Sequence, residues 1–85
     1  MNIFVFSVRA KEIFRSLEIS DQERILKKLE YLKTHPNIFL VLRSLQGMLP
    51  ATHRLRVGNF RLIIVQQIQG KFLILDIGHR REIYK

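Results

Sequence analysis

The sequence predicts an α+β domain in which a helical hairpin covers one face of an antiparallel β-sheet. Two observations carry this prediction. A short apolar strand is followed by two segments with helical periodicity, and the C-terminal half consists of strand-like runs separated by glycine-containing dipeptides. We therefore expect the order β-α-α-β-β-β, in which the last three strands form a meander, and one domain over residues 1–85.

The first half of the chain is expected to form a strand and two helices. The apolar, aromatic segment 2–6 favours a strand. Ser7 can cap the helix that follows it. At the second helix, Ser20 and Glu23 have the spacing of a capping box with an acidic residue between them, and Pro36 ends the helix. Because only a few residues separate the two helices, we expect an antiparallel hairpin.

Residues 37–51 have no clear pattern, whereas the rest of the chain is regular. Gly58-Asn59 and Gln69-Gly70 have the length and composition of two-residue hairpin turns. Three strands are therefore expected, over residues 52–57, 60–68 and 71–77.

The register of this meander determines which way its charged residues face. A two-residue turn at Gly58-Asn59 places Arg56 opposite Arg61, on the same face as Arg54. The second turn brings Arg61 level with Gly78. Like charges directly opposite each other cost roughly 0.2–1 kcal/mol, so their presence indicates a site for an anion. Guanidinium groups bind phosphate oxygens in pairs, which favours a phosphodiester as the ligand.

The same register sorts the other residues of the meander between the two faces. The face toward the helices is expected to hold Leu55, Val57, Phe60, Leu62, Ile64, Leu73, Leu75 and Ile77. Ile63, Val65 and Ile74 are expected on the arginine face, together with Asp76, which is placed to orient a guanidinium.

Charge and composition narrow the classes of partner. Lys and Arg number 15 against 7 Asp and Glu, which gives a net charge of +8 and predicts nucleic acid or an acidic protein as partner. The chain has no cysteine and no metal-ligand spacing, so we expect neither a metal site nor a cofactor. It also lacks a membrane-length apolar run and a signal-peptide pattern, so a cytoplasmic location without membrane contact is expected.

The C-terminal third resembles the RelE branch of the RelE/ParE toxin superfamily. The resemblance rests on His53-Arg-Leu-Arg-Val-Gly-Asn-Phe-Arg-Leu-Ile-Ile64 and on Ile77-Gly-His-Arg-Arg-Glu-Ile-Tyr84. Segments 6–11, 23–29 and 45–47 are similar to the first strand, the helical hairpin and the Leu-x-Gly element of that family. The resemblance implies the toxin of a type II toxin–antitoxin system, an endoribonuclease that cuts messenger RNA on the ribosome. It also implies an acidic RelB-like antitoxin, with operator DNA as a ligand of the complex.

The resemblance implies a metal-independent attack of a ribose 2′-hydroxyl on the adjacent phosphate. Carried over to this sequence, the arginine that binds the phosphate in the transition state is Arg61. The second catalytic arginine, on the leaving group, is Arg80, and the C-terminal tyrosine is Tyr84. Arg54 and Arg56 occupy the two basic positions in the strand before the turn.

Arg56 departs from the family members that have a lysine as general base here, because an arginine is a poor proton acceptor. His79 is the first substitute, since imidazole titrates near neutral pH, and His53 is the second. The C-terminal tyrosine is a third substitute for the general base, provided that the ribosome aligns the message. Arg81 is an alternative to Arg80 as the second catalytic arginine, and it is also expected to contact the substrate.

Two other functions stay open from the sequence. The first is inhibition of DNA gyrase by a ParE-like protein of the same fold, without nuclease chemistry. The second is a basic module that binds RNA or a protein partner and has no enzymatic activity, which the missing family lysine favours.

Overall fold

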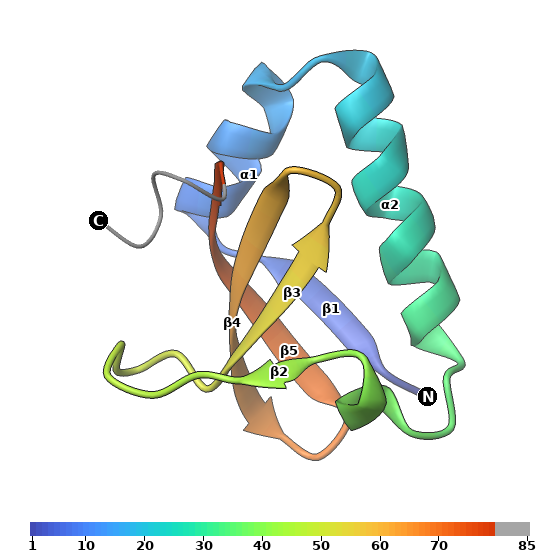
Figure 1. The fold of residues 1–85 in the computed structure, drawn as a ribbon, viewed down its shortest axis with the longest axis vertical. Helices are drawn as coiled ribbons and strands as arrows, with labels where there is room; N and C mark the ends of the chain where they lie inside the picture. The colour runs from blue at the N-terminus through green and yellow to red at the C-terminus, as the bar shows by residue number, and fades with distance from the viewer. Residues whose placement is uncertain (80–85) are drawn as a thin grey trace.

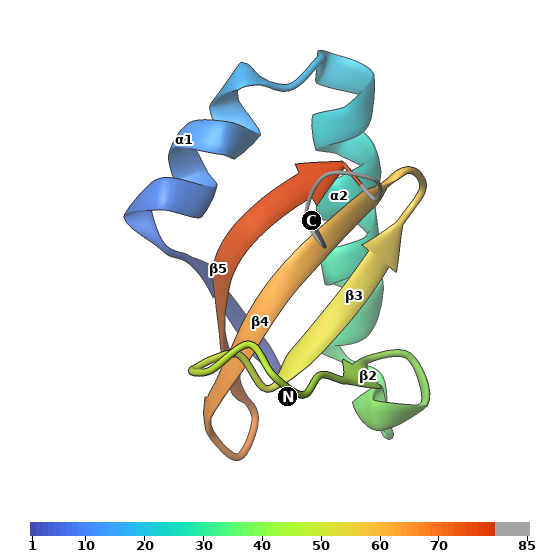
Figure 2. The same ribbon diagram turned by 60° about the vertical axis from the view of Figure 1, so that its left-hand side comes forward.

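The computed structural model describes residues 1–79, so Arg80, Arg81 and Tyr84 lie outside the described residues. Its elements are β1 (Ile3–Phe6), α1 (Val8–Ser16), α2 (Ile19–Lys33), the short 3₁₀ helix η1 (Ile38–Leu40), β2 (Arg43–Ser44), β3 (His53–Val57), β4 (Phe60–Ile68) and β5 (Lys71–His79). Figure 1 shows the two helices joined by a short connection, and in Figure 2 the strands β3 and β4 lie in front of α2. The predicted α+β class and the order of strand, helical pair and meander are confirmed.

All the strands belong to one sheet with the order β1-β5-β4-β3-β2. The meander β3-β4-β5 is antiparallel as predicted, but β1 pairs with β5 in parallel. The meander therefore forms the antiparallel sheet that was predicted, and β1 extends it into a mixed sheet. The two helices between β1 and the meander supply the crossover that a parallel pair needs. Hydrogen bonds of 2.7 Å from Ile3 N–H to the Gly70 carbonyl and 2.9 Å from Ser7 N–H to the Ile74 carbonyl tie β1 and its end to β5.

The register predicted for the arginine strands is confirmed. Arg56 pairs with Arg61 across β3 and β4, and Arg61 pairs with Gly78 across β4 and β5. Both hairpin turns contain a glycine with positive φ, 59° at Gly58 and 80° at Gly70. The turn chemistry thus fixes which residues stand opposite each other.

An irregularity in β5 changes which side chains face the helices. Ile63 pairs with Asp76, whereas the next residue, Ile64, pairs with Ile74. Leu75 is therefore the extra residue of a β-bulge, and alternation is reversed on either side of it.

The bulge overturns part of the predicted core. Phe72 and Ile74 are 1% and 0% exposed and belong to the core cluster, so the placement of Ile74 on the arginine face is wrong. Leu73 and Leu75, predicted to face the helices, are only half-buried and lie outside the cluster. The rest of the predicted helix-facing set is in the core or packs against it.

The core lies between the helices and one face of the sheet. Its helical side chains are Ala10 from α1 and Ile25, Leu29 and Leu32 from α2. Within residues 1–79 no helix has the length and apolar character needed to span a membrane.

The predicted cap of α1 is confirmed, and it also connects the helix to the sheet. Ser7 Oγ accepts a hydrogen bond of 3.0 Å from the Ala10 N–H and donates one of 3.0 Å to the Leu75 carbonyl. Ser7 thereby holds the start of α1 against β5 at the bulge.

The predicted capping box of α2 is wrong. The helix begins at Ile19, and its N-cap is Glu18, which makes no side-chain capping bond. The Gln22 N–H donates to the Glu18 carbonyl at 3.0 Å, so helical hydrogen bonding starts from that carbonyl. Ser20 and Glu23 therefore lie inside the helix, because its backbone pattern starts two residues before the predicted cap.

Ser7→Ala should lower the free energy of unfolding by about 1–2 kcal/mol, because it removes a cap and a second hydrogen bond to the sheet. Urea denaturation measures this change. Ser16→Ala is the control, since the Ser16 hydroxyl makes an exposed bond to the Ile13 carbonyl within its own helix. It should change stability by less than about 0.5 kcal/mol. Equal losses in the two variants would contradict this role for Ser7.

Candidate functional site

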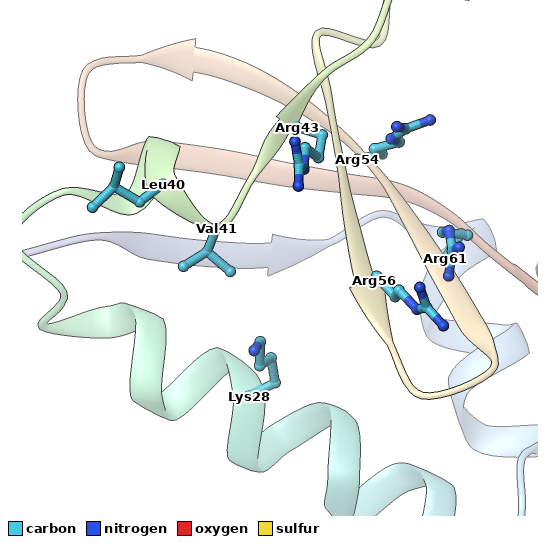
Figure 3. A pocket seen from close by; sticks show the side chains of 7 residues that line it. All are labelled: Lys28, Leu40, Val41, Arg43, Arg54, Arg56 and Arg61. Carbon is cyan, nitrogen blue, oxygen red and sulfur yellow. The ribbon is translucent and has the colours of Figure 1, made fainter.

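Basic side chains from α2 and three neighbouring strands share one open groove, which we call the arginine groove (Figure 3). It has a volume of about 510 Å³. The groove is lined by Lys28, Leu40, Val41, Arg43, Arg54, Arg56 and Arg61. The structure therefore brings together the predicted residues Arg54, Arg56 and Arg61.

Sheet pairing explains the concentration of charge. Arg43 of β2 stands opposite Arg54 of β3, and Arg56 of β3 stands opposite Arg61 of β4. Two pairs of like charges therefore lie side by side on the face away from the core. Each such pair costs roughly 0.2–1 kcal/mol, and a bound anion would remove that cost.

Two basic residues of the groove, Arg43 and Lys28, were not among the predicted site residues. Arg43 belongs to β2, a strand of 2 residues in the segment without a clear pattern, so nothing local indicated its pairing. Lys28 is on α2, where a lysine normally marks the solvated side of a helix. Its position beside the strands depends on how the helix packs, and Figure 3 shows it between α2 and β3.

His53 lies on the other face of β3 from the groove arginines, because it alternates with them along the strand. Its ring centroid is 5.2 Å from that of Phe39. The Nδ1 atom is 2.9 Å from the Thr52 hydroxyl oxygen. His53 does not line the groove.

His79 ends β5 and also faces away from the groove. It pairs with Phe60, whose side chain packs against the core, and the two ring centroids are 6.1 Å apart. Gly78, one residue earlier, is the residue opposite Arg61. Within the described chain, neither histidine is therefore brought to Arg61.

Asp76 binds a guanidinium outside the groove. Its Oδ1 is 3.2 Å from Nε of Arg9, at the start of α1, and it also accepts a bond of 2.9 Å from the Ile77 N–H. Among residues 1–79, the guanidinium that Asp76 orients is thus that of Arg9.

Burial lowers the pKa of His53 from its ordinary value of 6.5. The unfolded chain therefore binds a proton more readily than the folded chain at this position. The free energy of unfolding is therefore highest above pH 6.5, where His53 is neutral in both states. It should fall as the pH drops from 6.5 to the lowered pKa of His53 in the folded protein, because only the unfolded chain gains the proton there. His53→Gln should remove this part of the pH dependence. Urea midpoints measured between neutral and mildly acidic pH test it, and identical profiles for the two proteins would contradict it.

The chemistry of the groove follows from its side chains. Among the described residues that line it, all the charged ones are cations, and guanidinium groups bind phosphate in a bidentate manner. Arginines stay protonated, so they can stabilise a developing negative charge but cannot accept a proton. No three histidine or acidic side chains within residues 1–79 are grouped as a metal site would need.

Several solved structures are similar to this chain over nearly its whole length. The isolated RelE toxin of E. coli is 26% identical with a TM-score of 0.71, and the match covers 99% of this chain and 92% of that one. RelE in the intact E. coli RelBE toxin–antitoxin complex is 24% identical with a TM-score of 0.70, covering 93% and 96%. The archaeal RelE–RelB complex from Pyrococcus horikoshii OT3 gives 20% identity and a TM-score of 0.72, covering 95% and 97%. No family model matches the sequence, and the search of curated proteins gives no significant match.

Proposed function

We propose that this chain is a toxin of the RelE/ParE-like superfamily and that it cleaves messenger RNA on the ribosome; its likeness to the RelE toxin of E. coli supports this. The observation that carries this proposal is the convergence of Arg54, Arg56 and Arg61 in one groove. These residues occupy the basic positions that the family resemblance assigns to substrate and to the transition state. A groove lined by cations fits the phosphate backbone of RNA.

In the proposed reaction, the ribose 2′-oxygen forms a bond to the adjacent phosphorus and the bond from phosphorus to the 5′-oxygen breaks. The products are a 2′,3′-cyclic phosphate and a free 5′-hydroxyl. Arg61 stabilises the extra negative charge on the reacting phosphate, while Arg54 and Arg56 hold the RNA backbone on either side of that phosphate. Arg80 stabilises the charge on the leaving 5′-oxygen, which takes up a proton from solvent, and Arg81 adds a contact to substrate.

The proton of the 2′-hydroxyl needs an acceptor, and the groove arginines cannot provide one. His53 and His79 both face away from the groove. We therefore assign the proton transfer to the phenolate of Tyr84, on a message that the ribosome aligns.

The proposed partner is an acidic RelB-like antitoxin. The chains similar to this one include RelE bound to RelB. A net charge of +8 favours an acidic partner, and binding of that partner over the arginine groove would also block RNA. The complex, in the cytoplasm, is expected to bind operator DNA.

A translation extract tests the proposed function. The wild-type protein should cut a translated message, leave the same RNA intact when ribosomes are removed, and lose activity when the acidic protein encoded beside it is added. Intact messages together with persistent gyrase–DNA cleavage complexes would instead assign the ParE-like function. Intact messages without gyrase complexes would leave a non-catalytic binding module.

A further inference from the structure

A second pocket adjoins the arginine groove, because Lys28 and Arg56 line both. Its volume is about 370 Å³. It lies between α2 and the β3–β4 turn, and its lining residues are Arg24, Lys27, Lys28, Tyr31, Arg56, Val57 and Gly58. We call it the tyrosine pocket, because Tyr31 is the aromatic residue in its lining.

Tyr31 offers a flat, accessible surface in this pocket. It is 56% exposed, so more than half of the residue is accessible to a ligand. The Lys28 ammonium is 5.6 Å from the ring centroid, and the His35 ring meets it edge-on at 5.4 Å between centroids. These neighbours hold the ring in place while more than half of the residue stays open to solvent.

The β3–β4 turn leaves room for a cation in the same pocket. Gly58 has φ of 59°, and a Cβ atom at this position would lie 3.0 Å from Nη1 of Arg24. The missing side chain thus lets the Arg24 guanidinium lie against the turn. Together with Lys27, Lys28 and Arg56 it makes the lining of the pocket strongly positive, and the described lining includes no carboxylate.

We propose that the tyrosine pocket binds a further nucleotide of single-stranded RNA, next to the nucleotides in the arginine groove. The base stacks on Tyr31, and Arg24 and Lys27 hold the adjoining phosphate. An aromatic face among cations matches both parts of a nucleotide, whereas an acidic peptide would use only the cations. This inference rests on the proposed function, since it extends the path of the same RNA substrate from the sheet onto α2.

The test measures binding of 2′-O-methyl RNA, which a 2′-hydroxyl nuclease cannot cut, in the absence of ribosomes. Fluorescence anisotropy compares a short oligonucleotide with one extended by several nucleotides at both ends. The wild type should bind the longer one more tightly. Stacking contributes about 1–3 kcal/mol per base, so Tyr31→Ala should weaken binding of the longer oligonucleotide about 5- to 150-fold and leave binding of the short one unchanged.

Two further variants make the result specific. Tyr31→Phe keeps the ring and should bind like the wild type, and Arg24→Ala should lower the salt dependence of the longer oligonucleotide by about one phosphate contact. Lys11→Ala, on α1 and outside both pockets, controls for loss of one positive charge.

The proposal is overturned if the wild type shows no preference for the longer RNA, or if Tyr31→Ala binds it like the wild type. It is also overturned if Tyr31→Ala weakens only the binding of an acidic antitoxin peptide and not that of RNA, which would assign the pocket to a protein partner. Ring-dependent RNA binding by a wild-type protein that cuts no message would refute the nuclease function and support the pocket. A wild-type protein that cuts messages, but whose RNA binding does not depend on the Tyr31 ring, would support the nuclease function and refute the pocket.

Discussion

Arg61→Ala should lower the rate of message cleavage by about 10²–10³-fold, which is the usual effect of removing one group that stabilises a developing negative charge. Arg61 lines the arginine groove opposite Arg56, and its Nη1 donates a long hydrogen bond of 3.4 Å to the Phe60 carbonyl. Its removal also relieves a like-charge pair, so stability should change by no more than about 1 kcal/mol. Loss of cutting would then reflect chemistry and not unfolding.

Single-turnover cleavage of a ribosome-bound message measures this effect. Lys11→Ala removes the same charge from α1, outside the groove, and should reduce cleavage only slightly. If both variants lose activity equally, the effect is a general attraction between a basic protein and ribosomal RNA. If Arg61→Ala cuts at the wild-type rate, the assignment of the phosphate site to the groove is wrong.

Phe72→Ala should lower the free energy of unfolding by about 3–5 kcal/mol. The side chain is 1% exposed and stacks on Phe4, with 5.3 Å between ring centroids. It also meets Phe39 edge-on at 6.3 Å. A small domain has about 5–15 kcal/mol in total, so this one substitution removes much of the stability. Urea denaturation at equilibrium provides the measurement.

Leu73→Ala is the matched control for that prediction. Leu73 is the next residue in the same strand, is only half-buried, and lies outside the core cluster. Its truncation should cost clearly less than that of Phe72. The reverse order would contradict the bulge at Leu75, because without the bulge Leu73 would face the helices.

Local signals made much of the fold predictable. The glycine turns determine the register of the meander, and Ser7 precedes a clear helical pattern. The bulge at Leu75 had no such signal, because an apolar strand looks the same with either alternation. The parallel pairing of β1 depends on which edge of the meander the helices leave open, and that is a matter of packing between distant segments.

The candidate site divides in the same way. Arg56 and Arg61 follow from a single hairpin, so counting from its turn was enough to place them together. Arg43 and Lys28 reach the groove through tertiary contacts, which no spacing along the chain expresses. The direction of His53 was within reach of the sequence, since it stands two residues before the buried Leu55 and so shares a face of β3 with it.

The most direct test of the central claim is the chemistry of the cut in a ribosome-bound message. The wild-type protein should produce a 2′,3′-cyclic phosphate and a 5′-hydroxyl at a mapped site. The same message with a 2′-deoxyribose at the cleaved nucleotide should remain intact, because the attacking oxygen is missing. Equal cutting of both messages would contradict attack by the 2′-hydroxyl, and a wild-type protein that leaves both intact would contradict the nuclease function itself.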